Sequence, residues 1–200
     1  MKLIVGLGNP GEKYENNRHN VGFQFLDYFI DQYQKSPLRP KGYEGQVKFK
    51  SNKYLLSDVC ELATSNEQPA TNLVLAKPTT FMNKSGIAVK KIIENFKLNP
   101  PAGGENLIIA HDDLDIPFGK FHIQVGVGPE LHNGIESIEN HLKTKDFFRI
   151  RIGVDNRVPE KKIAGETYVL SNFIQEEVAK LNSEIFPKII DQLKLSHQIP

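Results

Sequence analysis

The sequence is poor in cysteine, in long apolar runs and in net charge. Its only cysteine among 200 residues is Cys60, which excludes an internal disulfide bond and suits a reducing, cytoplasmic environment. No stretch approaches the roughly 20 apolar residues of a membrane span. The opening MKLIVGLGNPG holds too short an apolar run for a signal peptide. With a formal net charge of +1, nucleic-acid binding would require a local basic patch.

Length and periodicity favour one α/β domain over residues 1–200. Apolar runs ended by turn residues predict strands, and apolar residues spaced by three or four predict helices. We expect strands at 2–8, 53–59, 72–78, 106–110, 120–128 and 147–154, helices around 21–33, 89–96, 135–142 and 178–189, and loops at 35–45, 64–72 and 100–105. Pro187 should kink the last helix. Strands alternating with helices predict a twisted, mixed, largely parallel sheet with helices on both faces.

Gly6, Gly8 and Gly11 have the G-x-G-x-x-G spacing of a dinucleotide-binding loop. Such a loop leads straight from its third glycine into a helix, whereas Gly11 is followed by the polar segment EKYENNRHN. Pro10 also lacks the backbone N–H that a phosphate loop would use. The pattern favours a loop that positions side chains, with a nucleotide-dependent enzyme as the alternative.

Polar side chains are expected to gather at one edge of the sheet, because they follow predicted strands or precede helices. The carboxyl ends of parallel strands are where α/β proteins build their sites. Histidine suits general-base chemistry near neutral pH, a carboxylate can orient it, and amides donate and accept hydrogen bonds without charge. The residues expected there are Asn9, His19, Met82, Asn83, His111, Asp112, Asp113 and Asn133.

Six segments carry a resemblance to a known family. VGLGNPG, RHNVG, KPTTFMNKSG, HDDLDIPFGK, HNGI and FRIRIGV occur in an order and at spacings that closely resemble bacterial-type peptidyl-tRNA hydrolases. The resemblance covers nearly the whole chain. It implies a single α/β domain, monomeric and without metal or cofactor, that cleaves the ester between a peptide and the tRNA 3′ end.

The resemblance also implies roles for individual residues. His19 would be the general base and Asp112 its partner, with Asn9 binding the substrate carbonyl. Substrate binding would involve Tyr14, Met82, Asn83 and Asn133. The tRNA would be bound by Arg151, Lys120 and His122.

Charge and loop composition add two expectations about RNA. From Lys143 to Lys162 there are seven basic and three acidic residues, which fits either an RNA-binding surface or a solvated one. GVGPELHNG, with Pro129, Glu130 and Leu131, stands where the family usually has a glycine-rich loop. Proline restricts the backbone and Glu130 brings negative charge near the expected RNA path, so the family's loop mobility and tRNA affinity are not carried over to this chain. A noncatalytic RNA-binding relative is the alternative, although binding alone does not require a histidine–aspartate pair.

Several other residues have simpler interpretations. The cluster from His111 to Asp115 lacks calcium-loop spacing, so we expect no metal. Cys60 is expected to be a buried strand residue. Ser85 should serve a helix start, since NKSGI lacks a nucleophile elbow. His132 is expected to be structural.

Overall fold

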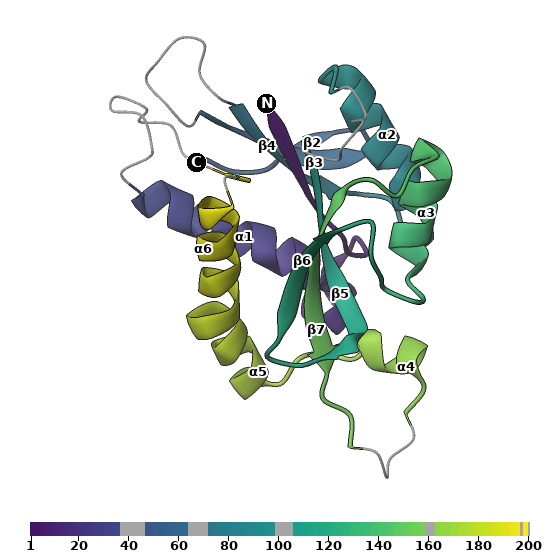
Figure 1. Ribbon diagram of the computed structural model, residues 1–200, viewed down its shortest axis with the longest axis vertical. Coiled ribbons are helices and arrows are strands. Elements are labelled where there is room, and N and C mark those ends of the chain that lie inside the picture. Colours follow the sequence, from purple (N-terminus) through teal and green to yellow (C-terminus); the bar gives the residue numbers. More distant parts are fainter. Residues whose placement is uncertain (37–46, 64–71, 99–105, 159–162, 197, 200) are drawn as a thin grey trace.

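A computed structural model describes residues 1–36, 47–63, 72–98, 106–158, 163–196 and 198–199 (Figure 1). The loops predicted at 35–45, 64–72 and 100–105 lie almost entirely outside these residues. Within the described part of the chain, no helix has both the length and the apolar character that crossing a bilayer requires.

A seven-stranded mixed sheet forms the centre of the molecule, in the order β2-β3-β4-β1-β5-β7-β6. β1 pairs in parallel with β4 and β5, and β5 pairs in parallel with β7. The outer pairs, β2–β3, β3–β4 and β6–β7, are antiparallel. The strands are β1 (Lys2–Gly6), β2 (Lys50–Asn52), β3 (Ser57–Ala63), β4 (Asn72–Pro78), β5 (Leu107–Pro117), β6 (Phe121–Val125) and β7 (Phe148–Asp155).

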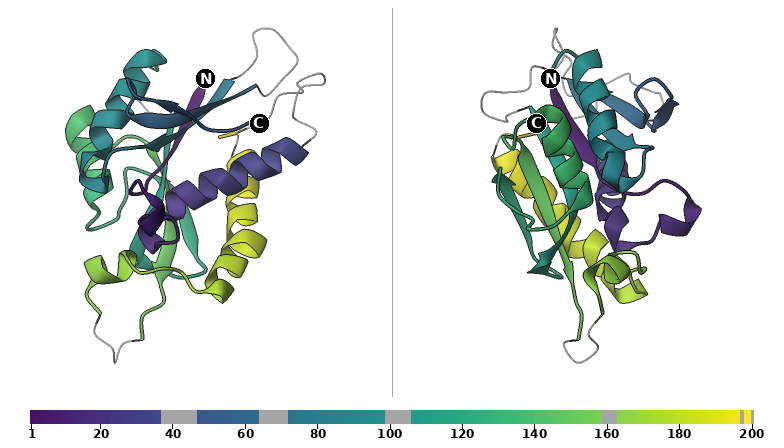
Figure 2. Two further views of the ribbon diagram at one scale, coloured as in Figure 1. Left: turned by 180° about the vertical axis from the view of Figure 1, so that it is seen from behind. Right: turned by 90° about the vertical axis from the view of Figure 1, so that its right-hand side faces the viewer.

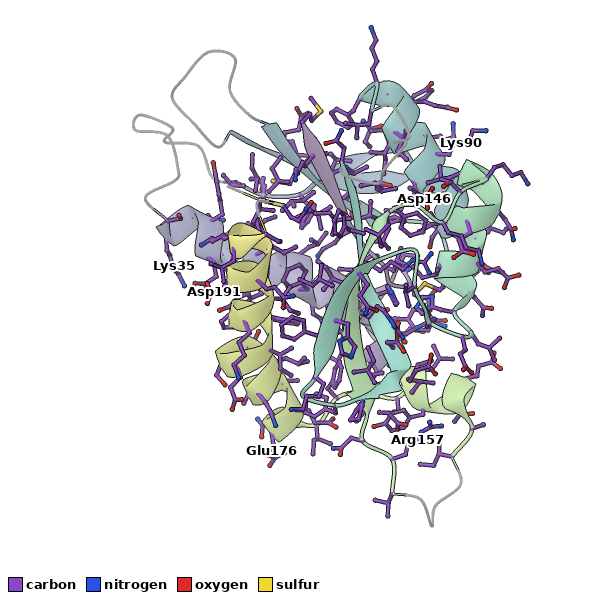
Figure 3. The ribbon with its side chains drawn as sticks, viewed as in Figure 1. Lys35, Lys90, Asp146, Arg157, Glu176 and Asp191 are labelled. Atoms are coloured by element: carbon purple, nitrogen blue, oxygen red, sulfur yellow. The ribbon has the colours of Figure 1, made fainter. Side chains whose placement is uncertain are left out.

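Helices cover both faces of the sheet, as expected from the sequence. One face packs on α1 (Val21–Lys35) and α6 (Phe186–Leu195), which cross in the left view of Figure 2. The other face packs on α2 (Ser85–Asn95) and α3 (Asn133–Leu142). In Figure 3 the labelled Lys90 projects away from the sheet on the outer side of α2, which fits an amphipathic helix.

The C-terminal helix is interrupted, as Pro187 predicts. α5 (Gln175–Lys180) leads through a π-helical turn at Leu181–Ile185 into α6, with Pro187 in the first turn of α6. Proline has no N–H to donate to the preceding turn, so the regular hydrogen-bond ladder cannot pass through it.

The start of β3 and the end of β5 differ from the sequence-based expectation. The strand expected at 53–59 begins only at Ser57, because residues 53–56 turn the chain from β2 into β3, with Leu56 at a φ of 51°. β5 does not end at residue 110 but runs on to Pro117, because β7 continues to pair with it, Asp112 lying opposite Ile152. Asp112 therefore lies within a strand.

The glycines of the first loop serve close packing of backbone. A Cβ on Gly6 would overlap the carbonyl oxygen of Gly22, and a Cβ on Gly22 would overlap that of Ala110. Gly11 has a φ of 105° and is followed by a short 3-10 turn, Glu12–Tyr14, so α1 does not start until Val21. The loop thus lacks the glycine-to-helix junction on which a pyrophosphate would lie.

The other expected structural roles are also found. Cys60 is buried in β3, and burial raises the pKa of its thiol to about 11. Ser85 is buried at the first residue of α2.

Candidate active site

Asn9 is held at the end of β1 by three hydrogen bonds. Its N–H donates to Asn20 Oδ1 at 2.9 Å, and Asn20 Nδ2 donates back to the carbonyl of Asn9 at 2.9 Å. The N–H of Met82 donates to Asn9 Oδ1, also at 2.9 Å. These bonds fix the orientation of the Asn9 amide, so that Nδ2 is the group it can offer as a donor.

His19 and Asp112 meet across 93 residues of sequence. His19 lies in the 3-10 turn Arg18–Asn20, and its Nδ1 is 2.8 Å from Asp112 Oδ1. β1 ends at Gly6 opposite Ala110, so β5 extends past it and carries Asp112 to the level of the loop that follows β1. If Nδ1–H donates to the carboxylate, the lone pair of His19 Nε2 is available to accept a proton.

His132 shares the same carboxylate oxygen, a role that sequence reasoning missed. Its Nε2 is 3.0 Å from Asp112 Oδ1. Its Nδ1 accepts hydrogen bonds from the N–H groups of Gly134 and Ile135, at 3.1 and 3.2 Å, and so caps α3. An Nδ1 that accepts leaves the proton on Nε2, which then donates to Asp112. The expected structural role is therefore present, together with a direct contact to the site.

Burial and charge act in opposite directions on this pair. Burial alone would raise the pKa of Asp112, but the charges of His19 and His132 and their hydrogen bonds hold it well below its usual range. Burial alone would lower the pKa of His19, but the charge of Asp112 and the hydrogen bond to it raise that pKa above 6.5. Asp112 is thus a carboxylate at neutral pH, and its charge favours the protonated form of His19.

His111 lies beneath these groups and is not available to substrate. It is fully buried, and its Nδ1 is 2.7 Å from the carbonyl oxygen of Asp112. Burial and the neighbouring His132 lower the pKa of His111 far below its usual range, so its imidazole stays neutral.

A cleft of about 530 Å³ opens over the His19–Asp112 pair. It brings together six residues that the sequence placed in the site: Asn9, His19, Met82, Asn83, Asp112 and Asn133. Its opposite wall comes from α4 (Gly165–Val169) and Leu170, which sequence reasoning missed. No motif marks that segment, and only the tertiary fold places it at the cleft.

The remaining predicted residues lie outside this cleft. Tyr14 is half-buried and packs edge-on against Phe81, with ring centroids 6.4 Å apart, and Phe81 itself lines the cleft. Lys120, directly before β6, and His122, on β6, are both exposed. Lys161 and Lys162 lie outside the described residues.

Arg151, which we expected to contact tRNA phosphate, is largely buried in an ion pair. Its Nε donates to Asp113 Oδ2 at 2.6 Å and its Nη1 to Gln124 Oε1 at 3.2 Å, and its side chain is 11% exposed. Its neighbour Arg149 is also buried, 2.7 Å from Glu139. Because side chains alternate along β7, both arginines lie on the same inward-facing side of the strand. The two arginines of the sequence RIRIG are thus paired with carboxylates inside the protein.

The hydrogen bonds of the site bear on whether it could hold a metal ion. Among the described residues, His19, Asp112 and His132 form a group whose potential ligand atoms lie within 4.8 Å of one another. His19 Nδ1 and His132 Nε2, however, already lie at hydrogen-bond distance from Asp112 Oδ1, and His132 Nε2 carries a proton. A metal ion at this point would have to displace both hydrogen bonds and that proton, so the arrangement favours a hydrogen-bonded centre.

Taken together, the fold and the site define an α/β protein with a histidine–aspartate pair in an amide-lined cleft, the arrangement of a hydrolytic enzyme. Comparison with known proteins gives the family: the peptidyl-tRNA hydrolase family model matches residues 3–198, and the chain belongs to this family.

Relatives and solved structures agree with this assignment. The chain is 40% identical over 185 residues to the peptidyl-tRNA hydrolase of Aliarcobacter butzleri, covering 92% of this chain and 86% of the relative. It is 38% identical over 190 residues to that of Aquifex aeolicus, covering 95% and 86%. The crystal structure of peptidyl-tRNA hydrolase from Acinetobacter baumannii superposes with a TM-score of 0.73 at 26% identity, covering 99% of this chain and 92% of that one.

We predict that an NMR titration of His19 gives a pKa above 6.5, and that Asp112→Asn brings it below 6.5. Removing the carboxylate removes the charge that raises the pKa, and burial, which lowers it, remains. An unchanged His19 pKa in Asp112→Asn would contradict the pairing.

We predict that Arg151→Ala destabilises the fold and impairs every substrate alike. It leaves the fully buried Asp113 side chain without its cation, and breaking a buried ion pair in this way costs about 3–5 kcal/mol. Urea unfolding measures the loss. The control is Arg157→Ala, whose pair with Asp155 is more exposed, with 28% and 29% of the two side chains accessible. Selective loss of tRNA affinity at unchanged stability would restore Arg151 as a phosphate contact.

Proposed function

We propose that this protein hydrolyses the ester that joins a peptide, or an N-blocked aminoacyl group, to the 3′ end of tRNA. The observation that carries the proposal is the 2.8 Å contact between His19 Nδ1 and Asp112, at the base of a cleft lined by three asparagines. A noncatalytic RNA-binding role would not require this pair. Membership of the peptidyl-tRNA hydrolase family supports the same conclusion.

His19 acts as the general base on water. Its Nε2 removes a proton as the water oxygen attacks the ester carbonyl, and Asp112 stabilises the imidazolium that forms. The tetrahedral intermediate then breaks its bond to the ribose oxygen of the tRNA. His19 returns the proton to that oxygen, which gives free tRNA and a peptide with a new carboxylate.

Asparagine amides handle the substrate around this reaction. Asn9 Nδ2 is a donor fixed by the bond from Met82 N–H to Oδ1, and it is assigned to the carbonyl oxygen on which charge develops. Asn83 and Asn133 are exposed in the cleft and are assigned to the ribose or peptide end and to the water with a peptide carbonyl, respectively. Uncharged amides can hold these groups without changing the titration of His19.

Apolar side chains form the path proposed for the peptide. Met82 is buried in the cleft wall, while Phe81 is 54% and Leu131 94% exposed at its rim. Tyr14 packs behind Phe81 and is assigned to substrate binding through it. Such a surface can accept peptides of many sequences, because apolar contact is not directional.

The tRNA is proposed to lie along the edge of the sheet at β6. Lys120 and His122 are exposed there. Lys145 is exposed as well, and its backbone carbonyl lies next to Gly126, the residue that follows β6. Exposed lysines can contact phosphates and the imidazole of His122 can donate a hydrogen bond to one, whereas Arg151 is paired with Asp113. The segment from Gly126 to Leu131 joins this edge to the cleft, and the N–H of Glu130 donates to Asp115 Oδ2 at 2.9 Å.

A cytoplasmic location, a monomeric state, a single domain over residues 1–200 and independence from metal ions and cofactors stay predictions as well. Gel filtration would test the second of these. Assays with and without a chelator would test the last.

We predict that His19→Ala lowers kcat for release of tRNA from an N-blocked aminoacyl-tRNA by about 10²–10⁴-fold, the usual contribution of a positioned base. Asp112→Asn should have a similar or smaller effect, because only the orienting partner changes. The control is His141→Gln, an exposed histidine near the end of α3 that does not line the cleft. Turnover close to that of the unmodified protein in His19→Ala would end the assignment.

We predict that replacing both Lys120 and His122 with alanine raises KM for tRNA substrates and flattens the dependence on salt. Removing one cation from a phosphate should lower the salt slope by about one unit. A peptide esterified to a nucleoside should be cleaved as before, because it reaches only the cleft. Equal impairment on both substrates would place the RNA path elsewhere.

A further inference from the structure

The short segment that carries His19 is fastened to a distant part of the chain. Asn17 forms a β-bridge with Asn172, and its Nδ2 donates to Leu170 O and to Asn172 Oδ1, both at 2.7 Å. The N–H of Arg18 donates to Ser171 O at 3.0 Å. The turn just before His19 is therefore held by the segment that follows α4.

The side chain of Arg18 strengthens this attachment inside the protein. Its Nη2 lies 2.6 Å from Glu177 Oε2, and the two side chains are only 6% and 4% exposed. Its Nη1 donates to Ser171 Oγ at 3.0 Å and to the carbonyl of Asn172. The guanidinium also lies over the ring of Tyr168, 4.4 Å from its centroid. An arginine fork bound in so many directions has little freedom to move.

Glu177 is itself fixed by groups other than Arg18. Its Oε2 accepts from Ile174 N–H at 3.0 Å, at the start of α5, and its Oε1 accepts from Asn156 Nδ2 at 3.1 Å. The carboxylate therefore ties the start of α5 and the end of β7 to the turn that carries His19. None of these groups has a part in the hydrolysis described above, and none lines the cleft.

The backbone of His19 is located by this attachment, while its ring is located by two contacts of its own. The ring is bonded to Asp112 and packs at a tilt on the ring of His132, with centroids 5.1 Å apart, and 12% of the side chain is accessible in the cleft. Arg18 is its chain neighbour in the same 3-10 turn, so a shift of the Arg18 backbone is passed directly to His19. A misplacement of about 1 Å can cost roughly 10²-fold in rate.

We propose that Arg18 and Glu177 are positioning residues for His19. The buried pair sets the location of the turn Arg18–Asn20 relative to β5, and so holds His19 Nε2 over the ester. The inference rests on the proposed function, since it assigns the pair to the base of that reaction. It extends that function by making a buried ion pair outside the cleft a determinant of kcat.

Arg18→Lys tests the proposal. Lysine keeps the charge but has one donor group in place of the fork, so it cannot reach Glu177, Ser171 and Asn172 together. We expect kcat to fall by about 10–100-fold while KM changes less than about twofold. In a His19→Ala background, Arg18→Lys should not lower the residual rate further, because the residue through which it acts is gone.

The control for reduced stability is Ile92→Ala, which opens a cavity in the core beneath α2, on the other face of the sheet. At a temperature where urea curves show each variant folded, its kcat should equal that of the unmodified protein. If Arg18→Lys fails to fold, Ser171→Ala replaces it, since Ser171 is exposed and accepts from Arg18. It should give a smaller loss of kcat with the same dependence on His19.

Three outcomes separate the possibilities. An equal loss of kcat in both backgrounds, or a rise in KM at unchanged kcat, overturns the inference and leaves the proposed function intact. Full activity of the single variant His19→Ala overturns the proposed function. A loss of kcat caused by Arg18→Lys that is absent in the His19→Ala background supports both the inference and the proposed function.

Discussion

The site depends on one oxygen atom, Asp112 Oδ1, to which two imidazoles donate. His19 approaches it at 2.8 Å and His132 at 3.0 Å, and Asp112 is only 2% exposed. A carboxylate removed from water to this extent is stable only if donors replace its hydration. The two histidines supply those donors. The carboxylate in return holds the proton of His19 on Nδ1, while the cap of α3 holds the proton of His132 on Nε2. Because the proton of His19 is held on Nδ1, its Nε2 is left with a free lone pair.

The fold delivers these groups from separate parts of the sheet. β5 extends beyond the end of β1 and carries Asp112 past it, while glycines at positions 6 and 22 let β1, α1 and β5 approach closely. His132 arrives as the cap of α3, on the opposite face from α1. Arg18 and Glu177 then fix the loop that brings His19 to meet them. A rigid sheet with attached loops can hold a general base to the accuracy that catalysis demands.

Local pattern predicted six of the seven strands and the four longest helices, because alternation and helical spacing report burial directly. Six residues of the cleft followed from their places after predicted strands or next to predicted helices. It could not predict that β5 continues through HDDLDIP, since those polar residues resemble a loop and are kept in a strand by pairing with β7. For a related reason the sequence does not show that Arg151 is buried: charge alone does not reveal that Asp113, 38 residues away in sequence, pairs with it. His132, the α4 wall and the Arg18–Glu177 pair likewise depend on contacts that only the tertiary structure makes.

The protonation pattern around Asp112 can be observed directly. Long-range nitrogen–proton NMR correlation spectra, recorded above the pKa of His19, distinguish a protonated from an unprotonated nitrogen in each imidazole ring. The account predicts a proton on Nδ1 of His19 and on Nε2 of His132, with His19 Nε2 unprotonated. It also predicts that Asp112→Asn disturbs the pattern of His19, while His132 keeps its own through the cap of α3. A spectrum of the unmodified protein in which His19 carries its proton on Nε2 would contradict the account, because that nitrogen could not then accept a proton from water.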